Sequence, residues 1–478
     1  MSREPRTIDV AALIDRSSLG RFNYRVIVLS WLVTAFDGID QLMIGFTAPY
    51  MRDELHLGNN EIGYLVSAGI AGMVIGGFVF SYLADRIGRR PAIIATAVAF
   101  GILTAATAAA SSFEALLFMR FANGLPLGGL IPLAWALNIE FSPRRMRSSM
   151  VTVIMLGYSF GGLAVGPLTN LLAPQHGWQG VYFAAGIATL GCAAALWIGL
   201  PESIRFLVVK GRQPERIVRT LRRIDPACDA EPTDRFVLGD ETAAARDFHL
   251  RELFRGKLRW VTPLLWLGYL MSSVAIFVLT SWSPIILESL DFARRTAALV
   301  ASLTSALGAI AALVLMRFTD RMGPGSITVC SGLAVPVLLV IGLGFVPHDL
   351  FLYITVAAAV LMSGMHYGWH SIAGIYYPSA IRASGGGWAS SVAKFGAILG
   401  PIVAGYFLSS GAPTVRIYAL LAVCPAVVTV CVLAIAAVVR AEERSAGGRE
   451  WVSNPPGTGW QPLPDLKSGR SSGNDSPP

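Results

Sequence analysis

The chain alternates long apolar runs with short polar stretches, and this alternation predicts its architecture. A helix rises about 1.5 Å per residue, so it needs roughly 20 apolar residues to cross a hydrocarbon layer of about 30 Å. Twelve such runs follow one another along the sequence. They cover residues 26–51, 62–83, 92–110, 115–140, 149–173, 179–200, 261–287, 296–317, 325–346, 350–377, 385–410 and 415–439. We therefore expect an all-α membrane protein with twelve transmembrane helices.

The polar segments divide the chain into five parts. We expect a cytoplasmic N-terminal segment at 1–25, a six-helix bundle at 26–200 and a cytoplasmic central loop at 201–259. A second six-helix bundle follows at 260–440. The Pro/Gly/Ser-rich tail at 441–478 has too few apolar residues to fold, so we expect it to be disordered and cytoplasmic. The N-terminal segment lacks a short apolar core with a cleavage site, so no removable signal peptide is expected.

Composition supports the membrane assignment, and the placement of charge orients the chain. Hydrophobic residues make up 54% of the sequence and charged residues only 14%, a balance that soluble domains of this length rarely show. About 32 of the 38 Lys and Arg residues lie in the termini and in alternate loops on one side. The opposite loops hold Arg52, Arg294, Arg295 and Arg416. The positive-inside bias therefore places both termini and the central loop in the cytoplasm of a bacterial inner membrane. The net charge of +8 is explained by this orientation, and no nucleic-acid partner is expected.

The two halves carry the same short motifs at an offset of about 235 positions, a pattern that indicates a duplicated helix bundle. The motif Asp-Arg-x-Gly at 85–88 recurs at 320–323. Likewise, Gly166-Pro167 in the fifth span is matched by Gly400-Pro401 in the eleventh. We therefore expect two pseudo-symmetric six-helix bundles.

The residues that occur at the same place in both halves can be explained by structure alone, without contact to a substrate. An acidic residue followed by basic ones at a tight cytoplasmic turn can pair with neighbouring helix ends, and so lock two spans together until the bundles rock. Small residues four apart let helix backbones approach closely in lipid. We assign a gating role to the charged residues of this pattern: Asp85, Arg86, Arg89, Arg90, Asp320 and Arg321.

Intramembrane polar residues that break the repeat are the better candidates for substrate or ion. Asp37 and Asp40 lie three residues apart on one face of the first span and map to Ser272 and Ala275. One charged carboxylate at mid-bilayer costs about 2.5–3.5 kcal/mol on insertion scales. Two such groups close together repel each other, so we expect at least one to bind a proton near neutral pH. A protonatable group at the midplane is what proton-coupled transport requires; the alternative is that one Asp only caps a helix broken beside Gly38.

Two cations are also buried and unrepeated. Arg120 lies a turn or so inside the outer end of the fourth span, where it can pair with Asp37 or Asp40 or offer a two-pronged contact to a substrate carboxylate. Lys394 lies near the midplane of the eleventh span, too deep to snorkel easily. We expect Lys394 to contact an anion, with a structural ion pair as the alternative.

Histidines and aromatic residues complete the candidate set. His366 and His370 lie one turn apart in the tenth span, where each can relay protons, contact substrate or hydrogen-bond another helix. Most aromatic residues of a membrane protein pack or form the interfacial belt, so only a fraction should touch a ligand. The intramembrane candidates for stacking are Phe36, Trp135, Tyr158, Trp266, Tyr269, Trp282, Trp369 and Tyr376.

These residues resemble the major facilitator superfamily. Its signature between the second and third spans is G-x-x-x-D-R-x-G-R-R, and residues 81–90 read S-Y-L-A-D-R-I-G-R-R, with Ser81 in place of the leading glycine. Within the superfamily the chain resembles the aromatic acid:proton symporters over about 25–440. Their D-G-x-D pattern in the first span is similar to residues 37–40. Three positions depart from the pattern: Pro126 replaces a glycine, and Gln179 and Lys394 replace arginines.

The resemblance implies import of a benzoate-like carboxylate together with a proton, for use in catabolism. It implies coupling roles for Asp37 and Asp40, and it makes Arg120 and Lys394 the cations for the carboxylate. His366, Trp135, Tyr158 and Trp369 complete the substrate-binding residues that we predict. The predicted partners are a small organic anion, protons and the lipid bilayer.

Other function classes fit less well. The nearest alternative is a symporter for a non-aromatic organic acid or a sugar on the same fold. A drug exporter is disfavoured because the acid pair and the buried cations suit an anionic cargo. A membrane enzyme or nutrient sensor would need a catalytic constellation or a signalling domain, and the sequence has no nucleotide loop and no metal-ligand cluster. Its five cysteines have no paired spacing, so we expect neither a disulfide nor a metal. We also expect no other cofactor and a monomeric transporter.

Overall fold

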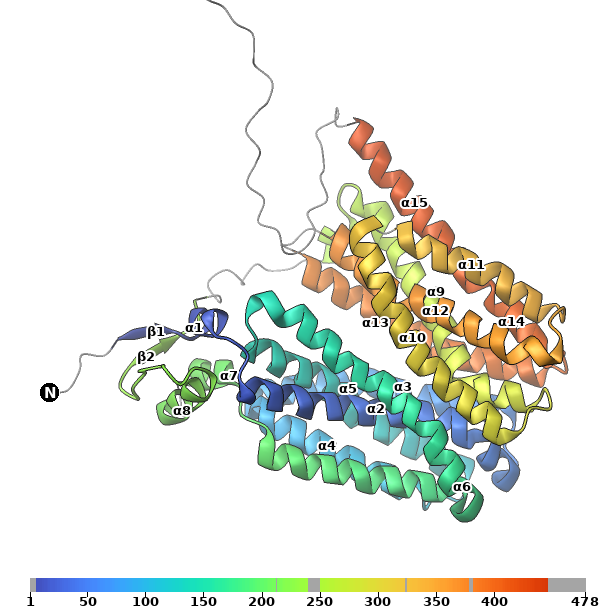
Figure 1. The fold of residues 1–478 in the computed structure, drawn as a ribbon, viewed down its shortest axis with the longest axis horizontal. Coiled ribbons are helices and arrows are strands. Elements are labelled where there is room, and N and C mark those ends of the chain that lie inside the picture. Colours follow the sequence, from blue (N-terminus) through green and yellow to red (C-terminus); the bar gives the residue numbers. More distant parts are fainter. Residues whose placement is uncertain (1–5, 212, 240–249, 323–324, 378–380, 446–478) are drawn as a thin grey trace, which may run out of the picture.

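The computed structural model describes residues 6–211, 213–239, 250–322, 325–377 and 381–445. Long helices dominate this part of the chain, and they occur where the apolar runs predict them (Figure 1). The first half contains α2 (Arg21–Leu55), α3 (Asn59–Ile87), α4 (Arg89–Thr107), α5 (Phe113–Phe141) and α6 (Arg147–Gly199). The second half contains α9 (Leu258–Glu288), α10 (Arg294–Met322), α11 (Gly325–Gly342), α12 (His348–Tyr376), α13 (Arg382–Ser409), α14 (Ile417–Leu421) and α15 (Val423–Ser445).

These helices account for all twelve predicted spans. Ten helical stretches in the described residues are long and apolar enough to cross a membrane, and one of them combines α14 and α15. Helix α6 supplies two spans, because it bends sharply at Gly177, whose φ of 65° and ψ of −178° lie outside the helical region. A positive φ is a conformation that glycine adopts without steric cost, so the fifth span turns into the sixth at this residue. The shorter apolar helix α11 is the remaining span, and the prediction of an all-α membrane fold is confirmed.

The two halves lie side by side and meet through three helix pairs, α2 with α9, α3 with α13 and α6 with α10 (Figure 1). Their polar contacts gather at one end of the molecule. There the Ser67 hydroxyl donates to the Ile398 carbonyl oxygen at 2.7 Å, and the Gly166 N–H donates to the Ser302 hydroxyl at 2.8 Å. We call this end, where α2 and α9 finish and α3 and α10 begin, the closed end.

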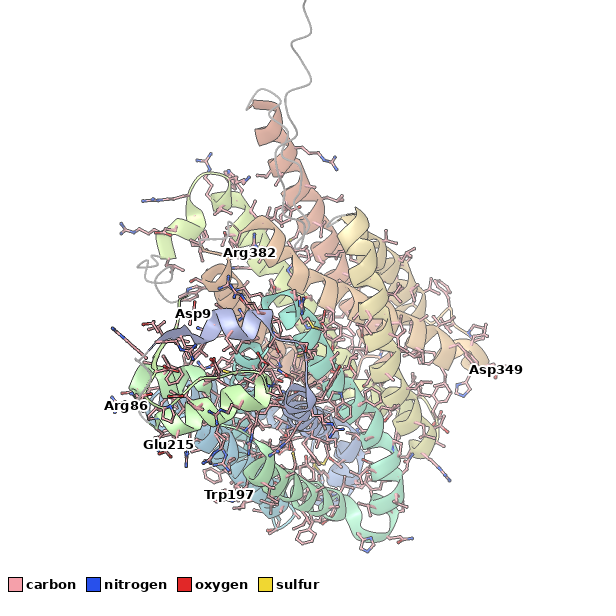
Figure 2. All side chains as sticks on the ribbon, turned by 60° about the vertical axis from the view of Figure 1, so that its left-hand side comes forward. Asp9, Arg86, Trp197, Glu215, Asp349 and Arg382 are labelled. Carbon is pink, nitrogen blue, oxygen red and sulfur yellow. The ribbon has the colours of Figure 1, made fainter. Side chains whose placement is uncertain are left out.

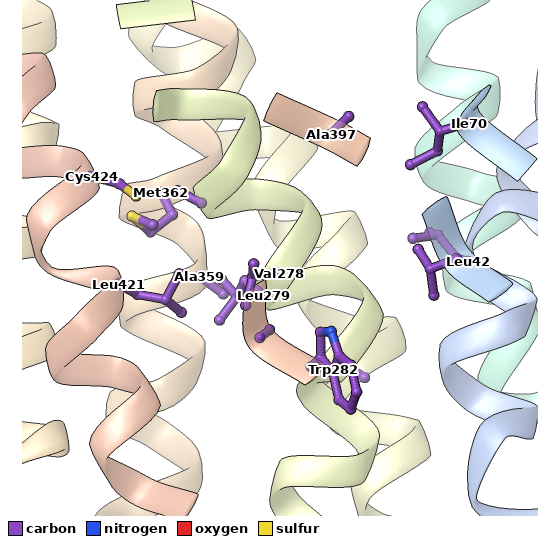
Figure 3. Close-up of a cluster of buried hydrophobic side chains, with 14 of the residues drawn as sticks. Leu42, Ile70, Val278, Leu279, Trp282, Ala359, Met362, Ala397, Leu421 and Cys424 are labelled. Carbon is purple, nitrogen blue, oxygen red and sulfur yellow. The ribbon is translucent and has the colours of Figure 1, made fainter. Parts of the chain in front are cut away.

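One apolar core crosses between the halves at the closed end. Figure 3 shows part of it, with residues of the second half on one side and Leu42 and Ile70 of the first half on the other. Trp282 of α9 is fully buried in this core. Burial of a large aromatic side chain contributes strongly to packing, so Trp282 helps to join the two halves at the closed end.

The opposite end carries a small layer built from the N-terminal segment and the central loop. Strand β1 (Thr7–Asp9) pairs in parallel with β2 (Arg235–Val237). Around this pair lie α1 (Val10–Arg16), α7 (Ile204–Lys210) and α8 (Pro214–Ile224). The short 3-10 helix η3 (Leu250–Phe254) packs instead on α9 of the second half, where the Thr262 hydroxyl donates to the Leu253 carbonyl oxygen at 2.6 Å. Two further 3-10 helices, η1 (Arg144–Met146) and η4 (Thr414–Arg416), connect long helices. Figure 2 shows Asp9, Arg86 and Glu215 gathered at this end and Asp349 at the other.

This layer belongs to the first half. Val10 and Ile14 of α1 are buried in an apolar cluster that contains residues of α2, α4, α5 and α8 but none of the second half. Asp15 also pairs with Arg144 at 3.0 Å, which ties α1 to the link between α5 and α6. From the sequence, these segments were expected only as polar connections. Helix α8 does show a helical period, with Ile217, Val218, Leu221 and Ile224 buried on one face, whereas α1, α7 and the two strands are too short to show one.

Candidate functional site

Glycines bring α3 and α5 unusually close together. A Cβ atom at Gly72 would lie 2.2 Å from the Phe121 carbonyl oxygen, and one at Gly124 would lie 2.1 Å from the Gly69 carbonyl oxygen. Real Cβ atoms cannot approach so closely, so only glycine allows this spacing. At Gly69 a Cβ would lie 3.1 Å from Nη2 of Arg120. The missing side chains therefore make the space in which the Arg120 guanidinium lies.

Arg120 forms a buried ion pair with Asp40. Its Nη1 lies 3.1 Å from Oδ2 of Asp40, and the two side chains are 5% and 3% exposed. The second oxygen of Asp40 accepts a hydrogen bond of 2.8 Å from the Asn123 amide nitrogen. The Thr104 hydroxyl donates at 3.3 Å to the side-chain oxygen of Asn123. Each oxygen of Asp40 thus has a donor, which is the condition under which a buried charge is tolerated.

Asp37, one turn earlier on α2, has the opposite environment. The residue is fully buried, and neither carboxylate oxygen has a hydrogen-bond partner among the described residues. Asp40 of its own helix and Tyr158 of α6 are its electrostatic neighbours. Tyr158 is brought close because Gly38 lies against its backbone, where a Cβ would be 2.3 Å from the carbonyl oxygen. The neutral side-chain amide of Gln41, four residues on along α2, also interacts with Asp37, although its nitrogen donates to Met73 Sδ at 3.1 Å. A carboxyl group without a positively charged partner is costly to keep charged.

A cavity lies beside this cluster, between the two halves. The first half contributes α2, α3, α5 and α6, and the second half contributes α9. Its wall offers guanidinium, amide and hydroxyl groups together with aromatic surface. The lining residues are Asp40, Gln41, Leu42, Val66, Gly69, Ile70, Met73, Arg120, Gly124, Leu127, Tyr158, Phe277, Thr280 and Ser281. The free space inside this wall is about 10 Å³ in this conformation, which is room for one water molecule. The wall must therefore move apart before it can hold a small molecule that has one anionic group and an apolar body.

Lys394 lies apart from Arg120. Its Nζ is 3.9 Å from the Cβ position of Gly77, so the side chain reaches from α13 of the second half to α3 of the first. Gly69, beside Arg120, is two turns away along α3, a separation of about 12 Å. Within the described part of the chain, Lys394 has neither an ion-pair partner nor a hydrogen-bond partner. The structure therefore does not bring the two predicted cations together.

The other predicted ligand residues occupy three kinds of position. Tyr158 lines the cavity. His366 Nδ1 lies 3.3 Å from the Ser272 hydroxyl, a contact between α12 and α9 of the second half. Trp369 is fully buried and donates to the Leu265 carbonyl oxygen at 3.1 Å.

Trp135 packs against a small cluster that contains Ile27 and Met150. Neither Trp135 nor Trp369 is among the residues that line the cavity in this conformation.

The predicted gating residues form a network within the first half. Arg89 pairs with Glu140 at the end of α5, and Glu140 also accepts from the Ser203 hydroxyl. Arg90 donates to the Leu200 carbonyl oxygen at 2.8 Å. Glu202 accepts from the backbone N–H groups of Arg89 and Arg90 at 2.9 and 3.1 Å.

The remaining gating candidates differ in their surroundings. Asp85 and Arg86 are exposed, and Arg86 lies over the Tyr82 ring at 4.5 Å. The side chains of Asp320 and Arg321, like that of His370, lie outside the described residues.

The closed end is joined by charged and aromatic groups that the sequence analysis did not single out. Arg294 of α10 reaches across to Asp53 of α2 at 2.8 Å and also pairs with Glu288 of α9. Its guanidinium lies 4.5 Å above the Tyr50 ring.

Asn123 and Gln41 were also missed at the site itself. Comparison of the two halves could have found both residues. The positions about 235 residues later are Ala358 and Ile276, whose side chains have no polar group.

The fold and the site together define a class. Two similar six-helix halves enclose a polar cavity beside buried charges, and the halves are joined at one end of a multi-pass membrane protein. This arrangement is that of a secondary transporter that works by alternating access. The chain belongs to the Major Facilitator Superfamily, whose sequence profile matches residues 30–369 and 265–471.

Curated relatives are similar along most of their length. The 4-hydroxybenzoate transporter PcaK of Pseudomonas putida is 32% identical over 409 residues, which covers 83% of this chain and 88% of that protein. The gallate transporter of Pseudomonas putida is 31% identical over 406 residues, covering 84% and 90%. The benzoate transport protein of Acinetobacter baylyi is 27% identical over 419 residues, covering 86% and 89%.

Solved structures with the same fold include transporters of low sequence identity. A bacterial homolog of the human lysosomal transporter Spinster, in an inward-facing and occupied conformation, matches with a TM-score of 0.68 at 16% identity, covering 88% of this chain and 98% of that one. The xylose transporter XylE from E. coli, in a partially occluded inward open conformation, matches with a TM-score of 0.65 at 18% identity, covering 86% and 97%. At this identity, the two matches show the fold.

Proposed function

We propose that the protein imports a small organic acid, an aromatic carboxylate such as a benzoate or hydroxybenzoate, together with protons across a bacterial inner membrane. The observation that carries the proposal is the cavity beside the buried Asp40–Arg120 pair, next to the unpaired carboxyl group of Asp37. The names of the similar proteins support an aromatic acid as the cargo. With the termini in the cytoplasm, the closed end faces the periplasm, and the conformation described here is inward-facing.

In this proposal Arg120 binds the carboxylate of the substrate. A guanidinium has five N–H donors, and in the described residues only Nη1 of Arg120 has a hydrogen-bond acceptor. Its Nε is buried without a partner, although the residue lines the cavity. Asp40 therefore holds the side chain in position and leaves donors for an incoming anion. Charge-assisted bonds from a planar guanidinium fix both the position and the orientation of a carboxylate.

Lys394 supplies a positive charge that no described neighbour cancels. It lies about 12 Å from Arg120 along α3, away from the closed end, so a carboxylate that moves between the cavity and the cytoplasm passes near it. Tyr158 and Phe277 offer aromatic surface in the cavity wall, on opposite halves of the protein. A planar ring packs well between two such side chains.

The charges explain how proton and anion are linked. Bringing a carboxylate to the cavity adds one negative charge to a site that already holds the acidic residues Asp37 and Asp40. A proton bound at the site compensates that charge. The transporter with substrate and proton bound then carries less net charge through the low-dielectric interior of the membrane when it changes conformation. Ligand that contacts both halves then favours their closure around it.

Uptake into membrane vesicles tests the proposal. Vesicles that contain the protein should take up radiolabelled 4-hydroxybenzoate faster than vesicles without it when the outside is acidic, and collapse of the gradient with an uncoupler should abolish the difference. The protein-free vesicles correct for passive entry of the neutral acid. A panel of benzoates, aliphatic acids and sugars then defines the cargo. Accumulation of a sugar, or of an aliphatic acid with no aromatic acid accumulated, would contradict the proposed substrate class.

A further inference from the structure

We infer that the two carboxyl groups of α2 have separate roles: Asp37 binds and releases the proton, and Asp40 remains an ionised counter-ion that Asn123 and Arg120 hold in place. This inference rests on the proposed proton coupling and deepens it. Asn123 is then a positioning residue, because it acts on the proton site only through Asp40.

The donors around Asp40 stabilise its charged form. Arg120 provides a full positive charge at 3.1 Å, and Asn123 provides an N–H group at 2.8 Å. A protonated carboxyl group would give up part of the attraction to Arg120, and its proton would need an acceptor. Both neighbouring groups are donors, so Asp40 has no place for a proton where it meets them.

The orientation of the Asn123 amide is fixed by a second contact. The Thr104 hydroxyl lies 3.3 Å from the amide oxygen of Asn123 and donates to it. The amide nitrogen must then point to Asp40, since the two ends of the amide have opposite hydrogen-bonding roles. Thr104 and Asn123 are each about 1% exposed, so water does not substitute for either contact. This chain of bonds presents the Asn123 donor to Asp40 and directs it away from Asp37.

Asp37 meets the requirements of a proton site. It is fully buried, and neither carboxylate oxygen has a hydrogen-bond partner within 3.5 Å among the described residues. The polar group that acts on it from its own helix, the Gln41 amide, is uncharged and donates to Met73 Sδ at 3.1 Å. The titratable groups near it are Asp40 on its own helix and Tyr158 on α6, with Tyr367 of α12 beyond Tyr158. The first carries a negative charge and the other two are neutral phenols, so no described neighbour supplies a compensating positive charge.

The proton balance follows from this arrangement. A proton from the periplasmic side converts the Asp37 carboxylate to the neutral acid, and the same proton leaves to the cytoplasm when the carboxylate is restored. The Asp40–Arg120 pair keeps its charges throughout. Asp37 therefore binds and releases one proton per cycle, one turn of helix away from an ion pair that keeps its charges.

Infrared spectroscopy of the purified, reconstituted protein tests the assignment, because a protonated carboxyl group has a carbonyl stretch that a carboxylate lacks. Near neutral pH the wild type should show this band, Asp37→Asn should lose it, and Asp40→Asn should retain it. Since Asp40→Asn leaves Arg120 without its counter-ion, the double variant Asp40→Asn with Arg120→Gln is measured alongside and should also retain the band. Loss of the band in either variant at position 40, or its persistence in Asp37→Asn, would overturn the inference.

The role of Asn123 is tested by removing its donor at similar volume. In Asn123→Leu the protonated fraction of Asp40 should increase, by ~10-fold or more at a given pH, because one hydrogen bond to the charged form is lost. A second carbonyl band should then appear on acidification and disappear when Asp40→Asn is added. Asn138→Leu is the matched control, since Asn138 is another buried amide of α5 that donates to a residue of α2, the Ser30 hydroxyl. An Asn123→Leu spectrum identical to that of Asn138→Leu across the titration would show that Asn123 does not position Asp40.

Transport by the same samples separates this inference from the proposed function. Wild-type protein that fails to concentrate the acid in a pH gradient would refute proton-coupled import, whichever residue carries the infrared band. If the wild type does concentrate the acid, Asp37→Asn should lose gradient-driven accumulation and retain exchange of labelled for unlabelled acid. Gradient-driven accumulation by Asp37→Asn equal to that of the wild type would overturn the assignment of the proton to Asp37 while leaving import intact.

Discussion

Replacing each acidic residue of α2 by its amide should have very different effects on stability, although the two positions are three residues apart on one helix. Asp40→Asn removes the counter-charge of Arg120, whose side chain is only 5% exposed. Breaking a buried ion pair by removing one partner costs about 3–5 kcal/mol, because the remaining charge is left buried and uncompensated. Asp37 has no partner to lose in the described structure, so Asp37→Asn should change stability by less than about 1 kcal/mol.

The difference of at least about 2 kcal/mol can be measured by reversible unfolding in mixed detergent micelles, with each variant compared with the wild type at the same pH. The double variant Asp40→Asn with Arg120→Gln should regain part of the loss, since it leaves no unpaired charge. Equal destabilisation by Asp37→Asn and Asp40→Asn would refute the conclusion that only Asp40 is held by an essential ion pair. A double variant that is less stable than Asp40→Asn alone would refute the cause assigned to that loss.

Three further predictions address the second cation, the closed end and the orientation. Lys394→Arg should retain partial uptake of the acid because charge is kept, whereas Lys394→Ala should reduce it at least ~10-fold, measured as initial rates in vesicles; equal activity of both variants would exclude a role for the charge. Gly45→Val should block closure between α2 and α9 and abolish uptake, because its Cβ would lie 2.5 Å from the Ser281 carbonyl oxygen. Gly191→Val is the control: no atom lies within 4 Å of the Cβ position there, so uptake should stay near the wild-type rate. A phosphatase fused after Arg440 should be inactive because that end is cytoplasmic, and an active fusion would reverse the topology.

The sequence predicts the fold well because lipid imposes strong local rules. Twelve apolar runs have to be helices, since backbone polar groups in hydrocarbon must be satisfied within each segment. The bend at Gly177 lies between two runs that the sequence already separates. The layer of α1, α8 and the paired strands β1 and β2 was not predicted, because its stability comes from contacts between segments more than 200 residues apart.

The candidate site was predictable only in part, for a similar reason. Burial of Asp37, Asp40 and Arg120 followed from their depth in apolar runs, and asymmetry between the halves marked them as special. Which carboxylate pairs with Arg120 depends on how α2 and α5 are rotated about their axes, and the sequence left both options open. Asn123 donates the second hydrogen bond to Asp40. The sequence indicates its role more weakly, because an amide in an apolar run costs less to bury than a charge.

The position of Lys394 illustrates a limit of the symmetry argument. Lys394 is a cation near mid-membrane that the first half does not repeat, and it lies in the opposite half from Arg120. This pattern predicts that both residues bind the carboxylate of the substrate. In this conformation they contact α3 at Gly77 and Gly69, two turns apart, and Asp40 already neutralises Arg120. The position of a residue in its apolar run predicts how deep in the membrane it lies. The distance between two residues of different halves depends instead on the conformation of the transporter.

Transport of a labelled acid and of its uncharged amide by purified protein in liposomes tests the central claim most directly. With an imposed pH gradient, acidic outside, the account predicts that 4-hydroxybenzoate and protons enter faster than in protein-free liposomes, and that 4-hydroxybenzamide enters at the protein-free rate. Uptake of the acid that only equilibrates and does not respond to the gradient, or accumulation of the amide to the same level, would contradict proton-coupled import of an aromatic carboxylate.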